Sequence, residues 1–525
     1  MSALKDAPAA VKPPKPPRLS LPVASLLGLA ALVTALGVGH LIAGFVGYNA
    51  SPFVAVADFV IAHSPHAVVV WAEQTLGTAD KTVLKIGLAV VLVLFALLAG
   101  AVSRRTPRGG QIVVVVLGIA GVAAVYQRTD VGQLALLAPV VALVASVLVF
   151  TWLHHYAVPS VPPASPGTGP TRRQVLTRGL GVAAGAGVAA VAGEALATTG
   201  SAAESRAAVG ALVAARKAPP LPPGADFQKF GSPPFITPNA DFYRIDTAFV
   251  VPQVRTEDWN LKIHGLVDRE VSFSYSDIRS RPLVEREVTL TCVSNDVGGD
   301  LISTAKFIGV DLVDLLGQAG VQPAAQQMYA TSVDGFTCST PAAVALDPAR
   351  GAMLAIGMNG EPLPVEHGFP ARIVIPGLYG YVSATKWVTD LEFARWDARQ
   401  SYWLQRGWAE QAPIKTESRI DSPAGPSSSV PAGRLRVAGT AWAQHVGIAK
   451  VEVRVDQGPW QSATLSTEVN KDTWRMWWTE VTVPSGSHSL TVRATDQSGY
   501  TQTDEVADPV PDGASGWHTV LVNAG

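Results

Sequence analysis

Cys292 is the residue whose type and position most clearly suggest chemistry. It follows the apolar segment Val288–Thr291, which reads as a strand, and precedes the glycine-containing loop Val293–Gly299. Loops at strand ends are where a rigid scaffold can present a reactive group or a ligand. A thiolate there could act as a nucleophile, as a metal ligand, or as half of a disulfide with Cys338. The spacing alone does not choose among these three.

A second group of chemical residues lies further along the chain. His367 and Arg372 stand at either end of a tight turn that enters an apolar run ending at Gly377, and Lys386 and Trp387 follow shortly after. Arginine offers a planar fork to a phosphate, and lysine offers a point charge. Cationic groups that bracket glycines are therefore what a phosphate-bearing cofactor would require. Each of these three side chains, taken alone, would be interpreted as an ordinary solvated surface charge.

Short strands and one helix must position these residues. We expect strands at 260–264, 287–290 and 371–375 and a helix at 310–319, so that 225–421 forms an α+β domain. The turn-rich stretch Ser422–Ser429 marks a boundary. Beyond it, alternating residues such as Val451, Val453 and Val455 predict an antiparallel β-sandwich of immunoglobulin-like type over 430–525.

The first part of the chain has a membrane-like composition. Only 15% of the 525 residues are charged and the mean hydropathy is +0.25, whereas soluble domains carry roughly 25% charged residues. We expect five transmembrane helices within 1–198, from the apolar runs 21–46, 83–102, 112–125, 134–150 and 180–197. The segment 53–71 is interrupted by polar residues, so we expect an interfacial or re-entrant piece there. A tether over 199–224, rich in Ala, Ser and Pro, would follow.

The basic residues predict the orientation of these helices. Clusters precede the first span, the third span and the fifth span, and all three lie on the cytoplasmic side if there are five spans. They comprise Lys5, Lys12, Lys15, Arg18, Arg104, Arg105, Arg108, Arg172, Arg173 and Arg178. The long C-terminal region then lies outside the cytoplasmic membrane. The formal net charge of −1 argues against a nucleic-acid partner.

Thr171–Leu176, with the pair Arg172-Arg173, resembles a twin-arginine export signal placed inside the chain. The alternative is that the two arginines are only topological charge. Ala195–Ala197 resembles a cleavage site, so release of the exported part is also conceivable. An intramembrane haem would need two facing histidines at similar depth, and interfacial or packing roles are the ordinary explanation for His40, His63, His66, His154 and His155.

From about Phe235 to the C-terminus, the chain resembles the sulfite oxidase family of molybdopterin enzymes. The Cys292 loop, the stretch His367–Gly377, Lys386-Trp387 and the following β-sandwich match the family in order. Phe235–Tyr243 and Trp259–Gly265 are similar to it as well. The resemblance implies a molybdenum-molybdopterin cofactor. It also explains the export signal, because the folded domain would cross the membrane after the cofactor is inserted.

The resemblance implies a role for individual residues. Cys292 would be the catalytic thiolate ligand of molybdenum, and Cys338 would be a buried small residue rather than its disulfide partner. The cofactor-binding residues would be Asn239, Phe242, Tyr243, Asp334, His367, Arg372, Ala384, Thr385 and Lys386. The sandwich commonly forms a dimer interface in this family, so a homodimer is one expected assembly.

Departures from the family pattern bear on the substrate. Val297-Gly298-Gly299 stand where sulfite oxidases have an arginine after the ligand cysteine, and Ile356 stands where they have an active-site tyrosine. We expect a membrane-anchored oxidoreductase that transfers an oxygen atom to or from a small molecule other than sulfite. It would pass electrons to a separate cytochrome or quinone-linked partner. The alternatives are a methionine-sulfoxide or S/N-oxide reductase of the same family, and a cofactor-free binding or scaffold protein.

Overall fold

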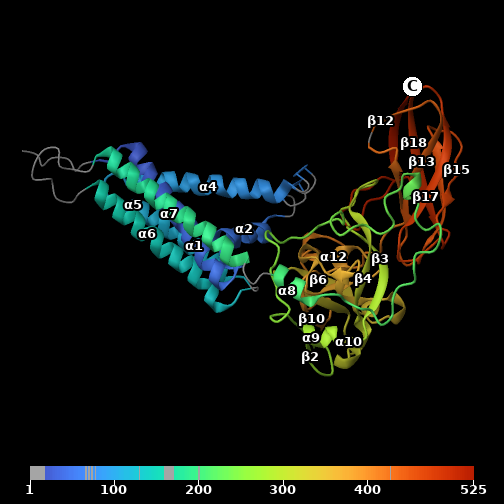
Figure 1. The fold of residues 1–525 in the computed structure, drawn as a ribbon, viewed down its shortest axis with the longest axis horizontal. Coiled ribbons are helices and arrows are strands. Elements are labelled where there is room, and N and C mark those ends of the chain that lie inside the picture. Colours follow the sequence, from blue (N-terminus) through green and yellow to red (C-terminus); the bar gives the residue numbers. More distant parts are fainter. Residues whose placement is uncertain are drawn as a thin grey trace, which may run out of the picture. The chain divides into compact units, whose positions relative to one another are not determined.

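The computed structural model describes residues 18–525 except 66–67, 69–70, 73–74, 77–78, 129–130, 159–170, 199–201 and 426. The chain forms two compact units, Met1–Thr199 and Gly200–Gly525 (Figure 1). The first unit is helical and the second contains all the β-sheets of the described residues. We describe each unit by itself.

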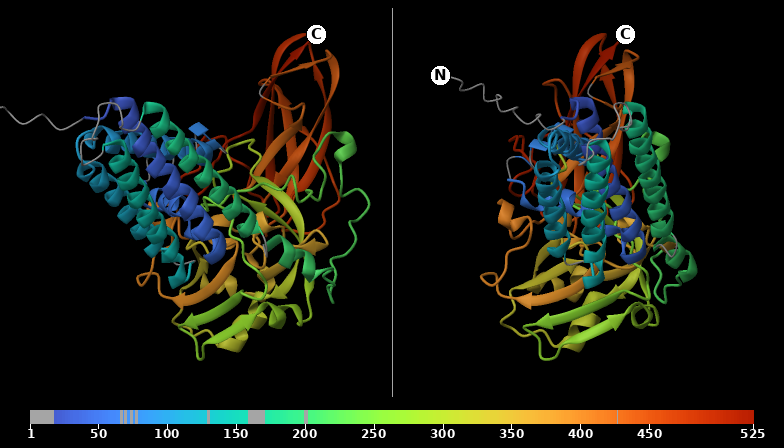
Figure 2. Two further views of the ribbon diagram at one scale, coloured as in Figure 1. Left: turned by 60° about the vertical axis from the view of Figure 1, so that its left-hand side comes forward. Right: turned by 90° about the vertical axis from the view of Figure 1, so that its left-hand side faces the viewer.

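Five helices of the first unit are long and apolar enough to cross a membrane (Figure 2). They are α1 (Leu21–Val46), α4 (Asp80–Val102), α5 (Arg108–Tyr126), α6 (Leu137–Ala157, preceded by η3, Gln133–Leu136) and α7 (Arg172–Thr198). Helix α1 packs against α4, α6 and α7. Small residues permit this, because a Cβ at Gly28 would fall 1.9 Å from the carbonyl oxygen of Ala96. The expected number of five apolar helices is confirmed.

The short helix α2 (Pro52–His63), which follows η1 (Tyr48–Ala50), occupies the interrupted apolar segment. It has 12 residues, fewer than a membrane crossing requires. His66 lies outside the described residues. Three of the described histidines in this unit bond to protein groups: His40 to Glu194 at 3.0 Å, His63 to the Phe59 carbonyl at 2.9 Å and His154 to the Ser103 carbonyl at 2.6 Å.

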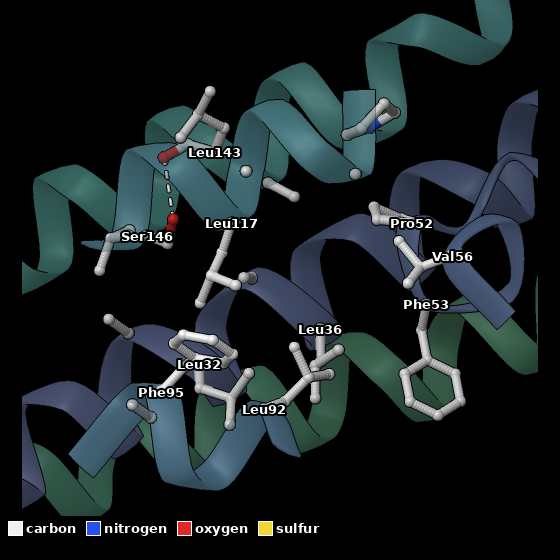
Figure 3. A pocket seen from close by; sticks show the side chains of 18 of the residues that line it. Leu32, Leu36, Pro52, Phe53, Val56, Leu92, Phe95, Leu117, Leu143 and Ser146 are labelled. Atoms are coloured by element: carbon white, nitrogen blue, oxygen red, sulfur yellow. Dashed lines mark hydrogen bonds between the residues drawn. The ribbon is translucent and has the colours of Figure 1, made fainter. Parts of the chain in front are cut away.

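An apolar cavity of about 760 Å³, including its opening, lies between α1, α2, α4, α5 and α6 (Figure 3). Its wall includes Leu32, Leu36, Phe53 and Phe95. The hydroxyl of Ser146 donates to the Leu143 carbonyl at 2.9 Å, so this polar group is already satisfied. The wall is suited to hydrocarbon chains and offers no charged side chain for catalysis.

The second unit contains one mixed sheet and one antiparallel sheet that share one core. In the first sheet, in the order β2-β1-β10-β5-β6, β1 and β10 are parallel and the other pairs are antiparallel. Its strands are β1 (Asn260–Gly265), β2 (Val271–Ser274), β5 (Gln327–Ser332), β6 (Thr337–Pro341) and β10 (Val388–Ala394). The second sheet has the order β3-β4-β7-β8, and β9 pairs with β7. Its strands are β3 (Val284–Thr291), β4 (Ile302–Asp311), β7 (Met353–Met358), β8 (Glu361–Pro362) and β9 (Arg372–Val374).

Short helices connect these strands. They are η4 (Gln228–Phe230), α9 (Tyr275–Arg279), α10 (Leu312–Ala319), α11 (Ala342–Ala345), η5 (Pro348–Arg350), η6 (Val365–His367), α12 (Gly380–Ser383) and η7 (Leu404–Arg406). Helix α10 buries Leu312, Leu315, Leu316 and Ala319 in the core, as a helical period of 3.6 residues requires. The prediction of an α+β domain is confirmed.

The C-terminal part is a β-sandwich of two sheets, with the orders β11-β13-β17-β16 and β12-β19-β18-β14-β15. Its strands are β11 (Glu417–Ser422), β12 (Ser427–Val430), β13 (Gly433–Trp442), β14 (Ile448–Val455), β15 (Gln461–Ser462), β16 (Thr464–Leu465), β17 (Arg475–Val483), β18 (Gly486–Asp496) and β19 (Thr519–Ala524). Val451 and Val453 are buried between the sheets, as their alternation predicts.

Two of the expected boundaries need correction. We expected a tether over 199–224, but α8 (Ala202–Val209) lies in it, and Ala202, Val209 and Leu212 are buried in the core of the second unit. An alanine-rich composition is typical of linkers, but it is equally compatible with a helix that packs closely against a core. The sandwich begins at Glu417 rather than at 430, because β11 pairs with β13 from Glu417 onward.

Candidate functional site

Cys292 directly follows the last residue of β3, at the mouth of the β3–β4 hairpin. Its backbone N–H donates to the Leu301 carbonyl at 2.9 Å, and its carbonyl accepts from the Asn295 N–H at 3.2 Å. The side-chain oxygen of Asn295 accepts from the Leu301 N–H at 2.8 Å. We call residues 292–300 the cysteine loop. These bonds fix the base of the loop, and Cys292 is partly buried there.

Cys338 does not pair with Cys292. It lies on β6, in the other sheet, opposite Ala330 of β5, and both cysteines carry thiols rather than a disulfide. Burial raises the pKa of the Cys338 thiol to about 11, so the thiol stays protonated at neutral pH. Cys338 therefore behaves as a small buried residue.

Two tyrosines lie close enough to Cys292 to interact with it electrostatically. Burial raises the pKa of both Tyr243 and Tyr379, and a charge on Cys292 raises each further. The charge of the Arg372 guanidinium opposes this rise in the pKa of Tyr243, so Tyr243 also interacts electrostatically with Arg372. A Cβ on Gly380 would be 3.7 Å from the Tyr243 hydroxyl and 3.8 Å from the Thr291 carbonyl, so Gly380 lies beside the same region.

Arg372, the first residue of β9, is only 5% exposed. Its Nη1 donates to the His367 carbonyl at 3.1 Å and its Nη2 to the Ala384 carbonyl at 3.5 Å, while its buried Nε has no hydrogen-bond partner among the described residues. No carboxylate of the described residues forms an ion pair with it. Burial lowers the pKa of Arg372 to about 10, so the group is still a cation at neutral pH. A buried guanidinium without a counter-ion is an anion site by its chemistry.

His367 is buried beside Arg372, and its Nε2 donates to the Asn239 carbonyl at 3.2 Å. Burial and the neighbouring cations Arg372 and Lys386 lower the pKa of His367 to about 4. The imidazole is therefore neutral at pH 7. Because Nε2 carries the proton, Nδ1 is an acceptor.

Lys386 supplies a second buried cation. Its Nζ donates to Asp246 at 2.9 Å and to the Glu366 carbonyl at 3.1 Å. Burial lowers the pKa of Lys386 to about 8, and Asp246 opposes that shift. Gly368 lies next to it with φ of +111°, and a Cβ there would be 3.2 Å from Lys386 Cα and 3.1 Å from Arg372 Cβ. Glycine at this position lets the two cationic segments approach each other.

The structure brings most of the predicted residues together. The Phe242 ring meets the His367 ring edge-on, with centroids 5.4 Å apart, and stacks on Tyr243 at 5.4 Å. Ala384 and Thr385 precede Lys386, and the Thr385 carbonyl accepts from the Ile373 N–H at 2.9 Å. The side chain of Asn239 instead turns to Glu361 (2.6 Å) and Asn359 (2.8 Å), so its backbone carbonyl is the atom that faces His367.

Asp334 lies in the turn between β5 and β6, where its Oδ1 accepts from the Phe336 N–H at 3.3 Å. The adjacent Val333 N–H donates to the Trp387 carbonyl at 3.0 Å, which ties this turn to the Lys386 segment.

Sequence reasoning missed several residues of the site. Asp246 was not among the predicted residues, yet it pairs with Lys386. Asn359 was not among them either; it has φ of +52° and bonds to Thr237, Asn239 and Lys306. An Asn-Gly pair after an apolar strand, as in Met358-Asn359-Gly360, is the turn signal that could have identified it. Residues of the sandwich also contact the cysteine loop. A local sequence pattern cannot predict such a contact, because the two residues are more than one hundred positions apart.

Comparisons with known proteins identify relatives of both parts of the second unit. Residues 248–403 match the family described as oxidoreductase molybdopterin binding domain, and residues 417–492 match a bacterial Ig domain. The uncharacterized oxidoreductase YuiH of Bacillus subtilis is 34% identical over 152 residues, which cover 29% of this chain and 72% of YuiH.

Two further similarities cover more of the chain. Mitochondrial sulfite oxidase of Homo sapiens is 29% identical over 320 residues, which cover 52% of this chain and 58% of that enzyme. The crystal structure of the sulfane dehydrogenase SoxCD from Paracoccus pantotrophus is 23% identical, with a TM-score of 0.49, and the match covers 58% of this chain and 88% of that one. With the matched binding domain and the YuiH relationship, the chain belongs to the sulfite oxidase family of molybdopterin-binding oxidoreductases.

Proposed function

We propose that this protein is a membrane-anchored, extracytoplasmic molybdenum enzyme that moves an oxygen atom to or from a small molecule other than sulfite. The observation that carries the proposal is Arg372, a buried cation that has no carboxylate partner among the described residues. It lies in one cluster with His367, Lys386 and, through Tyr243, Cys292. A bound anion would balance the charge of Arg372 in this cluster.

The residues present fit a molybdopterin cofactor. The unpartnered Nε of Arg372 and the ammonium of Lys386 would hold its phosphate end, and Nδ1 of neutral His367 would accept from a ring N–H. Gly368 lets the segments that carry Arg372 and Lys386 approach each other, which brings the two cations to one side of the site. The thiolate of Cys292 is a soft donor that suits a molybdenum ion.

When bound, the cofactor supplies two-electron oxygen-atom chemistry. The chain orients it and controls protons. Asn295 and Leu301 fix the base of the cysteine loop and hold the backbone of Cys292. The Tyr243 hydroxyl stays protonated at neutral pH because its pKa is raised, so it can donate a hydrogen bond to a substrate oxygen.

The charges on the cysteine loop oppose a sulfite dianion. Asp296 keeps an exposed surface, and partial desolvation of its carboxylate together with the nearby carboxylate of Asp508 raises its pKa. Arg419 reaches the loop, but its charge is matched by Asp421 at 2.6 Å. These groups favour an uncharged substrate, such as an organic sulfoxide or N-oxide, over a small dianion.

We therefore expect poor sulfite turnover even when the protein is fully loaded with molybdenum. Each missing charge-assisted hydrogen bond costs about 1.5–3 kcal/mol, so the loss of one cation weakens sulfite binding by roughly tenfold or more. Steady-state sulfite oxidation with an artificial acceptor is compared with reduction of methionine sulfoxide and dimethyl sulfoxide by a reduced dye. Sulfite turnover well above that of the organic oxides, with a micromolar KM, would refute the substrate assignment.

The five apolar helices support membrane anchoring, and the basic clusters support a cytoplasmic N-terminal side. Helix α7 begins at Arg172, so the paired arginines stand at the N-terminal end of the last apolar helix, which would be its cytoplasmic end in the proposed topology. Export of the folded second unit through the twin-arginine route would explain this placement, and a separate cytochrome or quinone-linked carrier would then exchange electrons with it outside.

Changing Arg172 and Arg173 together to lysine keeps the positive charge but is expected to block transfer of the second unit. Twin-arginine signals are read by a receptor, whereas topology depends on charge alone. Protease accessibility of the second unit in intact spheroplasts measures the outcome, with lysine substitutions at Arg104 and Arg105 as the matched control. If the second unit of the Arg172/Arg173 variant remained accessible to protease, the two arginines would contribute only positive charge to the membrane topology.

A further inference from the structure

The cysteine loop is contacted from outside its own domain by Arg419 of the sandwich strand β11. The guanidinium Nη1 of Arg419 donates to the carbonyl of Gly299 at 2.5 Å. Its Nε donates to Asp421 at 2.6 Å, and Asp421 in turn accepts from the Thr440 hydroxyl at 3.0 Å. The Arg419 and Asp421 side chains are only 11% and 14% exposed. The sandwich therefore fixes the orientation of the Arg419 side chain, and the same side chain binds the cysteine loop of the neighbouring domain.

A second sandwich residue, His518, closes over the same loop. Gly298 has φ of +79°, and a Cβ there would fall 2.2 Å from the ring of His518, so the imidazole lies directly on this glycine. The His518 Nδ1 accepts from the Ile420 N–H at 3.0 Å. Burial and the cation of Arg419 lower the pKa of His518 to about 4, so the ring is a neutral packing surface at pH 7.

The sandwich also holds the strand that leads to Cys292. Gln444 is buried, and its side-chain amide donates to the Thr291 hydroxyl at 3.0 Å, one residue before the cysteine. The Thr289 hydroxyl accepts from the Trp474 N–H at 2.7 Å, and the Thr289 N–H donates to the Asp472 carbonyl at 2.9 Å. Cys292 is thus flanked on both sides along the chain by segments that the sandwich fixes.

The far end of the cysteine loop depends most on Arg419. Bonds from Asn295 fix the base of the loop, and the Gly299 N–H donates to the Asp296 carbonyl at 2.8 Å within it, but Gly298 and Gly299 are adjacent and conformationally permissive. The described contact of the Gly299 carbonyl is the Arg419 guanidinium, and a charge-assisted bond of this kind is about twice as strong as a neutral one. The position of the Gly298–Gly299 end of the loop therefore depends on a residue of the sandwich.

We propose that Arg419 is a positioning residue for the site: it holds the cysteine loop through Gly299 and so fixes the direction of the Cys292 side chain. The immunoglobulin-like sandwich then completes the site rather than being an appended interaction module. The proposal rests on the proposed role of Cys292 as the metal ligand, but the position of the loop can be measured without any bound cofactor.

The test uses the full chain in detergent and the variants Arg419→Gln and Arg419→Lys. The matched control is Arg434→Gln, which removes an exposed ion pair with Glu480 on the same sandwich. Hydrogen–deuterium exchange is followed in peptides that cover 293–301 and in peptides from β13, β17 and β18. The molybdenum EPR signal after partial reduction is recorded on the same preparations, normalised to metal content.

We expect Arg419→Gln to speed amide exchange in 293–301 by about tenfold or more, with sandwich peptides unchanged and with a shifted EPR signal. Arg419→Lys should give an intermediate rate, because lysine can reach one partner but cannot form the planar fork to both. Arg434→Gln should leave the loop and the signal as they are. If Arg419→Gln proves unstable, Arg419→Lys alone decides the question by the same two readouts.

Loop exchange and EPR signals equal to those of the unaltered protein in both Arg419 variants would overturn the proposal. Faster exchange spread over the whole sandwich would also overturn it, because Arg419 would then act on folding alone. A preparation that contains no molybdenum would contradict the proposed function instead, and the exchange measurement would still test the loop.

Discussion

Replacing Cys292 with serine is expected to abolish redox turnover while leaving the fold and the bound pterin in place. The serine hydroxyl is a hard donor that stays protonated, so it cannot replace a soft thiolate on the metal. Loss of an outer-shell partner costs about 10- to 100-fold in metal sites, and loss of a direct ligand should cost more. The backbone bonds of Cys292 to Leu301 and Asn295 do not need the sulfur, so folding should persist. Dye-linked turnover per molybdenum atom is the measurement.

Cys338→Ala is the matched control for this variant. Its thiol is buried on β6 with a pKa raised to about 11, so it is unreactive at neutral pH. We expect this variant to lose some thermal stability and to keep its turnover. Full activity of Cys292→Ser, or loss of activity in Cys338→Ala alone, would show that the metal ligand has been assigned to the wrong cysteine.

Arg372→Gln is expected to empty the site of cofactor. Two charge-assisted hydrogen bonds at about 1.5–3 kcal/mol each correspond to a weakening of roughly 100-fold or more. Without cofactor, the unaltered protein buries a guanidinium that has no counter-ion among the described residues. Removing that charge should therefore leave the stability of the cofactor-free protein unchanged or higher. Molybdenum and pterin content and thermal unfolding are measured on the same preparations.

Arg286→Gln is the matched control in the same domain, because it should change stability but not cofactor content. Arg286 forms an ion pair with Asp311, away from the cysteine loop. Its loss should lower the free energy of unfolding and leave cofactor content intact. If Arg372→Gln retained full molybdenum and pterin, the buried cation would not be part of the cofactor site.

Much of the site could be predicted because its motifs are local. The cysteine follows an apolar strand, and His367 and Arg372 flank a turn, so residue type and short spacing identified them. The apolar helices could be predicted as well, because a run of roughly 17–25 apolar residues is typical of a membrane-spanning helix. The alternating valines of the sandwich likewise indicated its sheets.

Long-range pairings could not be predicted in this way. The ion pair between Lys386 and Asp246 joins residues 140 positions apart, and the bond between Arg419 and Gly299 joins residues 120 apart. The supposed tether failed for a related reason. Its alanines gave no amphipathic pattern, and only the finished core of the second unit shows why Ala202 and Leu212 are buried.

Molybdenum and pterin analysis of the purified, unaltered protein tests the central claim most directly. The account predicts about one molybdenum atom and one pterin per folded chain, because Arg372, His367, Lys386 and Cys292 form a single site for them. The protein should be taken from cells that make the cofactor and purified without chelators. A folded protein with neither molybdenum nor pterin under those conditions would contradict the account.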